Sequence, residues 1–169
     1  ADQNTHLIRN SALAGVLSRS LEQWANAINA LQLGGDRGLD VSETHEKRSV
    51  HTDSVRLELQ TDAGVTRVEG AVVLDKPRLV QVDGISCEAP LEGHITFLKN
   101  QDVPGVVGYV GGVLGKNNIN IASFSLGRKD ALAEAVSVIV SDQSVPDAVL
   151  NQLLENKALT QARSVEFSH

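Results

Sequence analysis

Apolar positions near the start of the chain recur at helical spacing. They fall at Leu13, Val16, Leu17, Leu21 and Trp24. This period predicts one or two helices with one buried face between residues 7 and 33. The adjacent Gly34 and Gly35 then predict the end of the helical segment, because glycine is common where helices stop.

Beyond the helical segment the pattern changes to the alternation that strands show. Residues 55–60 alternate strictly between apolar and polar side chains, so this strand is expected to expose one face and bury the other. Further strands are expected at 65–74, 78–82 and 85–89. Asp83-Gly84, between the last two, is typical of a type I′ hairpin turn. The first half is therefore predicted to be helices followed by an antiparallel sheet.

The second half follows a different order after a break at residues 90–93. We expect a domain boundary there, giving a first domain over 1–91 and a second over 92–169. The second domain is predicted to follow a β-α-β-β-α-β order, which is ferredoxin-like. Its expected elements are a strand at 94–98, a helix at 106–114, a strand at 119–126, a turn at 127–130, a strand at 133–140, a helix capped by Ser144 with Pro146 in its first turn, and a strand at 165–167. Three glycines in the first of these helices, Gly108, Gly111 and Gly112, are expected to allow close packing.

Composition and charge narrow the class of protein. The chain has 169 residues, of which 41% are hydrophobic and 21% charged, as in one or two globular domains. Its net charge of −6 and the lack of a basic block exclude a nucleic-acid or anionic-membrane surface. No apolar run approaches the ~18 residues of a membrane span, and the start lacks the order of a signal peptide. Cys87, the single cysteine, is expected to be a small buried thiol and fits a cytoplasmic protein.

Several catalytic patterns fail residue by residue. A phosphate-binding Walker loop would need glycine where Val110 stands and Ser or Thr where Asn117 follows Lys116. No G-x-G-x-x-G occurs, and the nucleophile-elbow pattern around Ser86 is broken by Glu88. The histidines are scattered without the spacing of a metal site, so no metal is expected. The chain itself is not expected to be an enzyme.

Polar residues gather where the strand at 94–98 leads into the helix at 106–114. Asn100 and Asp102 precede Pro104 and Gly105, at a helix N-terminus where free N–H groups and the helix dipole favour a carboxylate. Asp102 is suited to accept from an ammonium, and Asn100 offers a donor and an acceptor. An α-amino acid would satisfy these groups, although ordinary helix capping explains the same residues.

Two motifs in this region carry a family resemblance. Asn100-x-Asp102-x-Pro104-Gly105-Val106 resembles ACT domains in general, and NINIASFSLGR at 118–128 resembles the ACT domain that ends bacterial D-3-phosphoglycerate dehydrogenases. ALAGVL at 12–17, NAINA at 26–30, RSV at 48–50 and VQVDG at 80–84 look like the preceding, allosteric substrate-binding domain of the long form of that enzyme. The likeness is looser here, because the family usually has Val-Asn-Ala-Pro where residues 28–31 are Ile-Asn-Ala-Leu. The resemblance implies an α+β chain, a partial intervening domain with an antiparallel sheet followed by an ACT domain, and a C-terminal fragment whose nucleotide-binding and substrate domains would precede Ala1.

The resemblance also implies a function. The parent enzyme would use NAD to oxidise 3-phosphoglycerate in L-serine biosynthesis, whereas this fragment would hold no cofactor. L-Serine would bind where two ACT domains pair, in a homodimer or homotetramer, and inhibit the enzyme. Asn100 and Asp102, with Gly105 and Val106, would come from one subunit, and Asn120 with Ile121 from the other. We expect Asp102 and Asn120 to lie on the same side of the domain, at the sheet edge that pairs. Asn100 stands where some members carry His or Tyr.

A second site and two other functions stay open. In the family the intervening domain can bind a phosphorylated ligand, for which the candidates are Lys47, Arg48, Lys76 and Arg78. Solvated charges on turns explain the same residues. The module would also suit an L-serine dehydratase, which joins similar domains, or a degenerate ACT domain that only dimerises.

Overall fold

The computed structural model describes residues 5–18, 25–45, 54–129 and 133–167. They belong to two compact units, Ala1–His51 and Thr52–His169. The first unit contains α1 (Thr5–Ser18) and α2 (Ala30–Gly35), which bury Leu13 and Leu17 of α1 against Ala30. Leu13 and Leu17 confirm part of the buried face that the helical spacing predicts, whereas Val16 is exposed and Leu21 and Trp24 lie outside the described residues. Helix α2 ends at the predicted glycine pair.

The second helix begins later than its pattern predicts. Residues 25–29 are not helical, because two asparagines hold them in a turn. The Asn26 side-chain oxygen accepts from the amides of Ile28 (2.8 Å) and Asn29 (3.2 Å), and the Asn29 side-chain oxygen accepts from the Asn26 amide (2.7 Å). Such local bonds compete with helical hydrogen bonds, which explains the later start.

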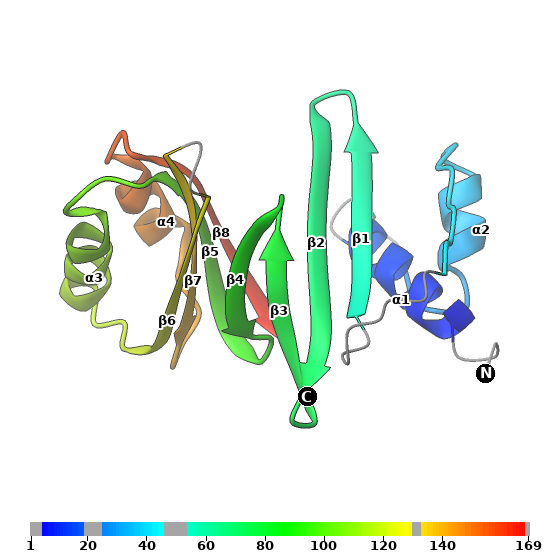
Figure 1. Cartoon of the computed structure of the whole chain (residues 1–169), viewed down its shortest axis with the longest axis horizontal. Helices are drawn as coiled ribbons and strands as arrows, with labels where there is room; N and C mark the ends of the chain where they lie inside the picture. The colour runs from blue at the N-terminus through cyan, green and yellow to red at the C-terminus, as the bar shows by residue number, and fades with distance from the viewer. Residues whose placement is uncertain (1–4, 19–24, 46–53, 130–132, 168–169) are drawn as a thin grey trace. The chain divides into compact units, whose positions relative to one another are not determined.

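Four strands open the second unit as an antiparallel sheet in the order β1-β2-β3-β4 (Figure 1). They are β1 (Ser54–Thr61), β2 (Gly64–Val73), β3 (Lys76–Val82) and β4 (Ile85–Pro90). The predicted type I′ turn between β3 and β4 is confirmed, since Asp83 and Gly84 both have positive φ, 48° and 83°. The prediction that β1 buries one face is wrong, because every residue of this edge strand is exposed.

The rest of the second unit has the predicted β-α-β-β-α-β order. Its elements are β5 (Gly93–Gln101), α3 (Val106–Lys116), β6 (Ile121–Arg128), β7 (Glu134–Ser141), α4 (Asp147–Leu154) and β8 (Leu159–Phe167). The sheet order β6-β7-β5-β8 leaves β6 and β8 at the edges. Gly127 and Arg128 belong to β6 rather than to the predicted turn. Ser144 does not cap α4, because Pro146 is its N-cap and accepts from the Val149 and Leu150 amides.

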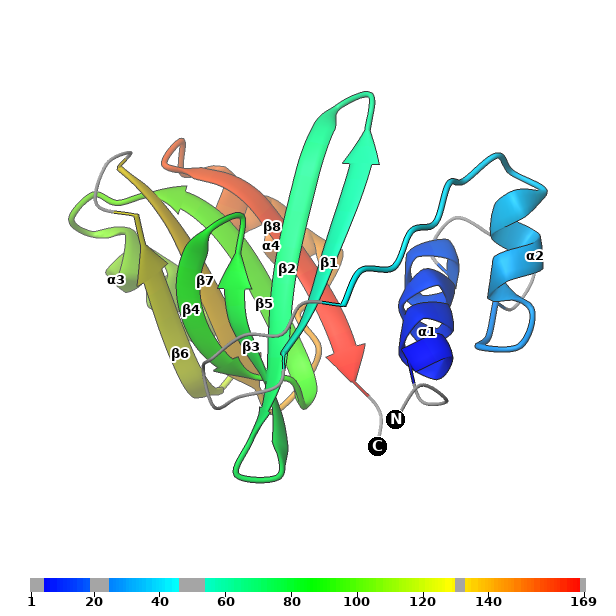
Figure 2. The same cartoon turned by 45° about the vertical axis from the view of Figure 1, so that its right-hand side comes forward.

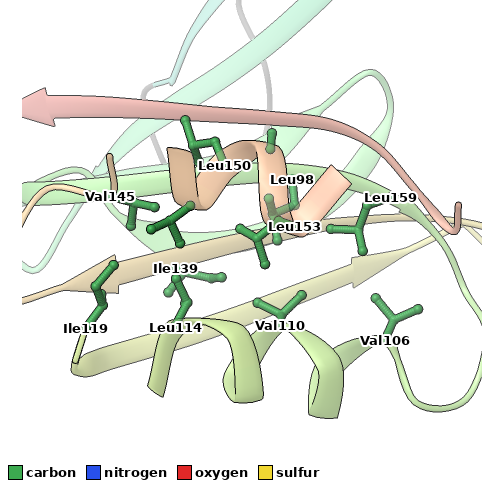
Figure 3. Close-up of a cluster of buried hydrophobic side chains, with 12 residues drawn as sticks. Leu98, Val106, Val110, Leu114, Ile119, Ile139, Val145, Leu150, Leu153 and Leu159 are labelled. Atoms are coloured by element: carbon green, nitrogen blue, oxygen red, sulfur yellow. The ribbon is translucent and has the colours of Figure 1, made fainter. Parts of the chain in front are cut away.

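Helices α3 and α4 cover one face of this sheet with an aliphatic core (Figure 3). Val110 and Leu114 of α3 meet Ile139 of β7 and Leu153 of α4, and all four side chains are completely buried. The glycines of α3 play no part in this packing. A methyl group built on Gly108, Gly111 or Gly112 meets nothing within 4 Å, so their predicted role in close packing is wrong within the chain.

The other face of the sheet is covered by β4 (Figure 2). A second core joins Ile85, Cys87 and Ala89 of β4 to Ile95, Val136 and Val138 of the ferredoxin-like sheet. Cys87 is the buried strand thiol that the sequence predicts. Burial raises the pKa of this thiol above its ordinary value, and a hydrogen bond from the Gly127 backbone offsets only part of that effect.

Gly127 marks a close approach of the two sheets. A Cβ at this position would clash with the Ser86 carbonyl and lie 2.9 Å from both Cys87 Cβ and Ile85 Cγ2. Two of these neighbours are backbone or Cβ atoms of β4, which do not move without moving the strand. Only glycine therefore lets β4 rest directly on β6.

A polar contact also joins the two sheets. Asp83, in the turn between β3 and β4, accepts a hydrogen bond from Lys99 Nζ on β5 and another, 2.8 Å long, from the Arg67 amide. Burial acts to raise the pKa of the Asp83 carboxyl. The bonds from Lys99 and Arg67 and the positive charges of both residues outweigh it, so the pKa lies below its ordinary value.

We expect this ion pair to make the second unit sensitive to acid. Because the folded-state pKa of Asp83 is lowered, its contribution is complete above its unfolded value of about 4 and is lost as pH falls through the folded value. Asp83→Asn should lower the free energy of unfolding at pH 7 by roughly 1–2 kcal/mol, between the values for exposed and buried pairs. Denaturant titration at pH 7 and at pH 3 measures this. A loss of equal size at both pH values would contradict the assignment to the carboxylate.

Candidate functional site

A pocket of about 370 Å³ opens between the end of β5, the start of α3 and the end of β6. It is lined by Asn100, Asp102, Val103, Pro104, Gly105, Val106, Val107, Leu126 and Arg128. Four of the six residues predicted for effector binding, all but Asn120 and Ile121, therefore line one pocket. The other five lining residues are apolar except for one basic side chain, Arg128.

Asn100 is the buried polar residue among those that line the pocket. It is 6% exposed, and its side-chain oxygen accepts from the Ser137 hydroxyl at 3.2 Å while its amide donates to the Gln101 carbonyl at 2.8 Å. These bonds fix the orientation of the side chain. The amide nitrogen carries a second hydrogen, for which no acceptor is found among the described residues.

Asp102 stands at the rim beside Arg128. Its backbone amide donates to the Ala133 carbonyl (2.7 Å), which fixes the loop after β5. One carboxylate oxygen lies 3.5 Å from Arg128 Nε, with the two side chains 34% and 62% exposed. The position suits the predicted contact with an ammonium, and the neighbouring guanidinium is a group to which the sequence reasoning gave no role. Its place at the end of the 118–128 motif was the available signal.

Gly105 and Val106 supply the helix end of the pocket. Gly105 is the N-cap of α3 with φ of 93°, a left-handed conformation that glycine adopts without strain, and no side chain caps the helix. The first amides of a helix have no partner within the helix. They are the expected donors to an anionic group in this pocket.

Asn120 and Ile121 lie at the opposite end of α3. The Asn120 amide donates to the Asp142 carboxylate at 2.7 Å, and the Asp142 backbone amide donates back to the Asn120 carbonyl. The 11 residues of α3, about 16 Å of helix, separate this end from Asp102. The prediction that Asp102 and Asn120 share one side of the domain is therefore wrong within a single chain, because the helix and β6 run the length of the domain between them.

Of the four candidate anion-binding residues, the structure describes two. Lys47 and Arg48 lie outside the described residues. Lys76 and Arg78 stand two residues apart on β3, which places both on one face of the sheet. Arg78 Nε is buried and has no hydrogen-bond partner among the described residues. This unpaired donor is the observation that supports an anion there.

Two family models match the chain. The model of the D-3-phosphoglycerate dehydrogenase intervening domain matches residues 1–83, and that of the ACT domain matches residues 94–157. The chain joins these two domains. The ACT match covers β5 to α4 and contains the whole pocket, so the pocket belongs to a domain class that generally binds amino-acid effectors and self-associates.

Curated proteins named D-3-phosphoglycerate dehydrogenase align with almost the whole chain. The D-3-phosphoglycerate dehydrogenase of Methanocaldococcus jannaschii is 31% identical over 155 residues, 92% of this chain and 30% of that protein. The Synechocystis enzyme is 30% identical over 93% of this chain and 29% of that protein, and the Bacillus subtilis enzyme is 28% identical over 90% and 30%. The chain therefore spans about 30% of the length of these relatives, and it is similar to their regulatory region.

A second, larger cavity lies between the ACT sheet and the turn after β3. It measures about 490 Å³, and Asp83, Lys99, Asn100 and Glu134 are among its polar lining residues. Asn100 therefore lines both cavities, while its neighbour Lys99 holds Asp83. Local sequence patterns do not predict this cavity, because it depends on β4 lying on the ACT sheet.

Other classes of site find little support among the described residues. No group of three or more His, Cys, Asp or Glu side chains there is placed to hold a metal ion. No helix in the described part of the chain is long and apolar enough to cross a membrane.

Proposed function

We propose that this chain is the L-serine-sensing region of a cytoplasmic, NAD-dependent D-3-phosphoglycerate dehydrogenase. The single observation that supports it best is the ACT pocket, where a carboxylate, a buried amide and an uncapped helix N-terminus line one space of about 370 Å³. These groups complement the ammonium, hydroxyl and carboxylate of a small α-amino acid. L-Serine is the end product of the pathway that the parent enzyme would begin, so its binding would give feedback control.

The site is proposed to form between two subunits. One chain cannot bring Asp102 and Asn120 to the same small ligand, because they lie at opposite ends of α3. If two chains pair antiparallel along their β6 edges, the two-fold axis places Asp102 of one beside Asn120 of the partner subunit. Each pair of ACT domains then holds two equivalent sites. Serine would favour one placement of the subunits over others, a coupling typically worth about 1–3 kcal/mol.

Calorimetric titration of the chain with L-serine tests this function. We expect saturable binding of two serines per dimer. The alternative is a degenerate ACT domain that only dimerises. In that case the same titration should give no heat of L-serine binding. The relatives named above are dehydrogenases, which favours this parent over an L-serine dehydratase.

We expect the chain to be at least a dimer, with a homodimer or homotetramer as the full assembly. Among the described strands, β6 is an edge strand paired only with β7, so the outer backbone groups of β6 are suited to pairing with another strand. Sedimentation equilibrium at tens of micromolar measures the mass. A single species of 18.0 kDa would count against the paired ACT domains.

We also expect the chain alone to be catalytically inert. The pocket offers an amino-acid-sized space, and no dinucleotide fingerprint is present in the sequence. Mixing the chain with NAD and 3-phosphoglycerate should give no rise in absorbance from NADH. Turnover above the background of a heat-denatured sample would show that the chain holds a catalytic site of its own.

The intervening domain is proposed to bind a phosphorylated ligand, for which Lys76 and Arg78 on β3 are the candidates among the described residues. The buried, unpaired Arg78 Nε supports this second role. The guanidinium of Arg78 would contribute bidentate hydrogen bonds to a phosphate.

A further inference from the structure

The pocket of the ACT domain contains a charge pair that its proposed ligand would have to open. Arg128 is the one basic side chain among the described residues that line this pocket, and Asp102 is the one acidic side chain. Arg128 Nε lies 3.5 Å from Asp102 Oδ1. In this structure the two side chains therefore form an ion pair with each other.

Arg128 is held in place by its neighbours in the strand. It is the last residue of β6, opposite Ala135 of β7, and it follows Gly127, which is buried against β4. The backbone that carries Arg128 is thus fixed, whereas its side chain is 62% exposed and free to adjust. Val106, Val107 and Leu126 form apolar walls of the same pocket.

We propose that Arg128 is a specificity residue that binds the α-carboxylate of the effector while Asp102 binds its ammonium. This role rests on the proposed function of the pocket. It assigns the Arg128 guanidinium to the negative charge of the amino acid. An amine alone would have to displace Arg128 from Asp102 and would exchange one ion pair for another. A zwitterion inserted between the two side chains replaces one ion pair with two. The pair therefore selects α-amino acids over amines that lack the carboxylate.

The guanidinium is chemically suited to this role. Its planar fork donates two parallel hydrogen bonds to a carboxylate, a geometry that lysine does not reproduce. The free amides at the start of α3 would act on the same carboxylate from the helix side.

The test compares two ligands on two variants. L-Serine and L-serinamide share the ammonium and the hydroxyl, but the amide lacks the negative charge. We expect the unmodified chain to bind L-serine more tightly than L-serinamide. In Arg128→Gln, L-serine affinity should fall about 10- to 100-fold, as for the loss of a charge-assisted hydrogen bond. L-Serinamide affinity should stay constant or rise, because Asp102 has been released.

A matched control separates charge from position. Lys129→Gln removes the same charge from the next residue, which is exposed and does not line the pocket, and should leave both affinities unchanged. Arg128→Lys keeps the charge without the fork, and it should recover only part of the L-serine affinity. Sedimentation shows whether each variant keeps its assembly.

Each other outcome counts against the inference. Equal losses for both ligands in Arg128→Gln, or loss of assembly, would make Arg128 a structural residue and overturn its role in recognition. Unchanged L-serine affinity in that variant would overturn it directly. If the unmodified chain binds no L-serine, the proposed function fails first and the inference fails with it.

Discussion

Replacing Gly127 by alanine should lower the free energy of unfolding of the second unit by about 1–3 kcal/mol or more, the usual cost of overpacking. The added methyl group has no free space, since Ser86, Cys87 and Ile85 of β4 already occupy it. The backbone of β4 must move away from β6 to admit the methyl group. The core between the two sheets, which includes Cys87 and Val136, would open as a result.

Gly112→Ala is the matched control for this change. Gly112 lies in α3, where a methyl group meets nothing within 4 Å. Alanine is the better helix former, so this variant should gain roughly 0.5–1 kcal/mol. Urea unfolding of both variants, followed by circular dichroism, gives the comparison. Equal stability changes in the two variants would show that β4 does not rest on β6 as the structure has it.

Replacing Asp102 by alanine should cost about 2–5 kcal/mol of L-serine binding free energy, the largest effect of any single change in the pocket. The ammonium of the ligand would be buried between two subunits without its carboxylate partner. Asn120→Ala should cost less, about 1–3 kcal/mol, because it removes a neutral hydrogen bond. Its side chain is free to leave Asp142 for the ligand, since that residue is exposed and can turn to water.

Calorimetry of the two variants with L-serine measures this ranking. Asp62→Ala, in the exposed turn between β1 and β2, is a control that removes the same charge far from the pocket in sequence. It should bind L-serine as the unmodified chain does. Unchanged binding by Asp102→Ala would place the ammonium elsewhere and remove the main support for the site.

Local patterns in the sequence predicted most elements of the second unit. Asp83-Gly84 specifies its hairpin because only a few residues accept positive φ at adjacent positions. The apolar period of Val106, Val110 and Leu114 specifies α3, because these side chains are the buried residues of that helix in the aliphatic core. Where such signals are local and strong, the sequence suffices.

Long-range arrangements were not predictable in the same way. The exposure of β1 depends on which strand of its sheet is covered, and β4 rather than β1 lies against the ACT sheet. The close contact at Gly127 has the same origin, so the residue was assigned to a turn. The alternation of apolar and polar residues along one strand predicts that its two faces differ. It does not identify which element covers either face.

The candidate site shows the same division. Asn100, Asp102, Gly105 and Val106 are close in sequence, and their gathering in one pocket follows from the strand-to-helix connection. The placement of Asn120 relative to Asp102 depends on the length of α3, which puts the two residues at opposite ends of the domain. Arg128 reaches the same pocket from the end of another strand, so spacing alone gives no sign of it.

Mixing two defective variants tests the two-subunit site most directly. Asp102→Ala and Asn120→Ala dimers each have two damaged sites. If subunits exchange at random, half of the dimers become mixed, and each mixed dimer combines an intact Asp102 from one chain with an intact Asn120 from the other. About one quarter of all sites should then recover the L-serine affinity of the unmodified chain. Calorimetry after exchange should detect this fraction. If exchange is confirmed and no tight site appears, Asp102 and Asn120 do not act on one ligand across the subunit interface, and the proposed site is wrong.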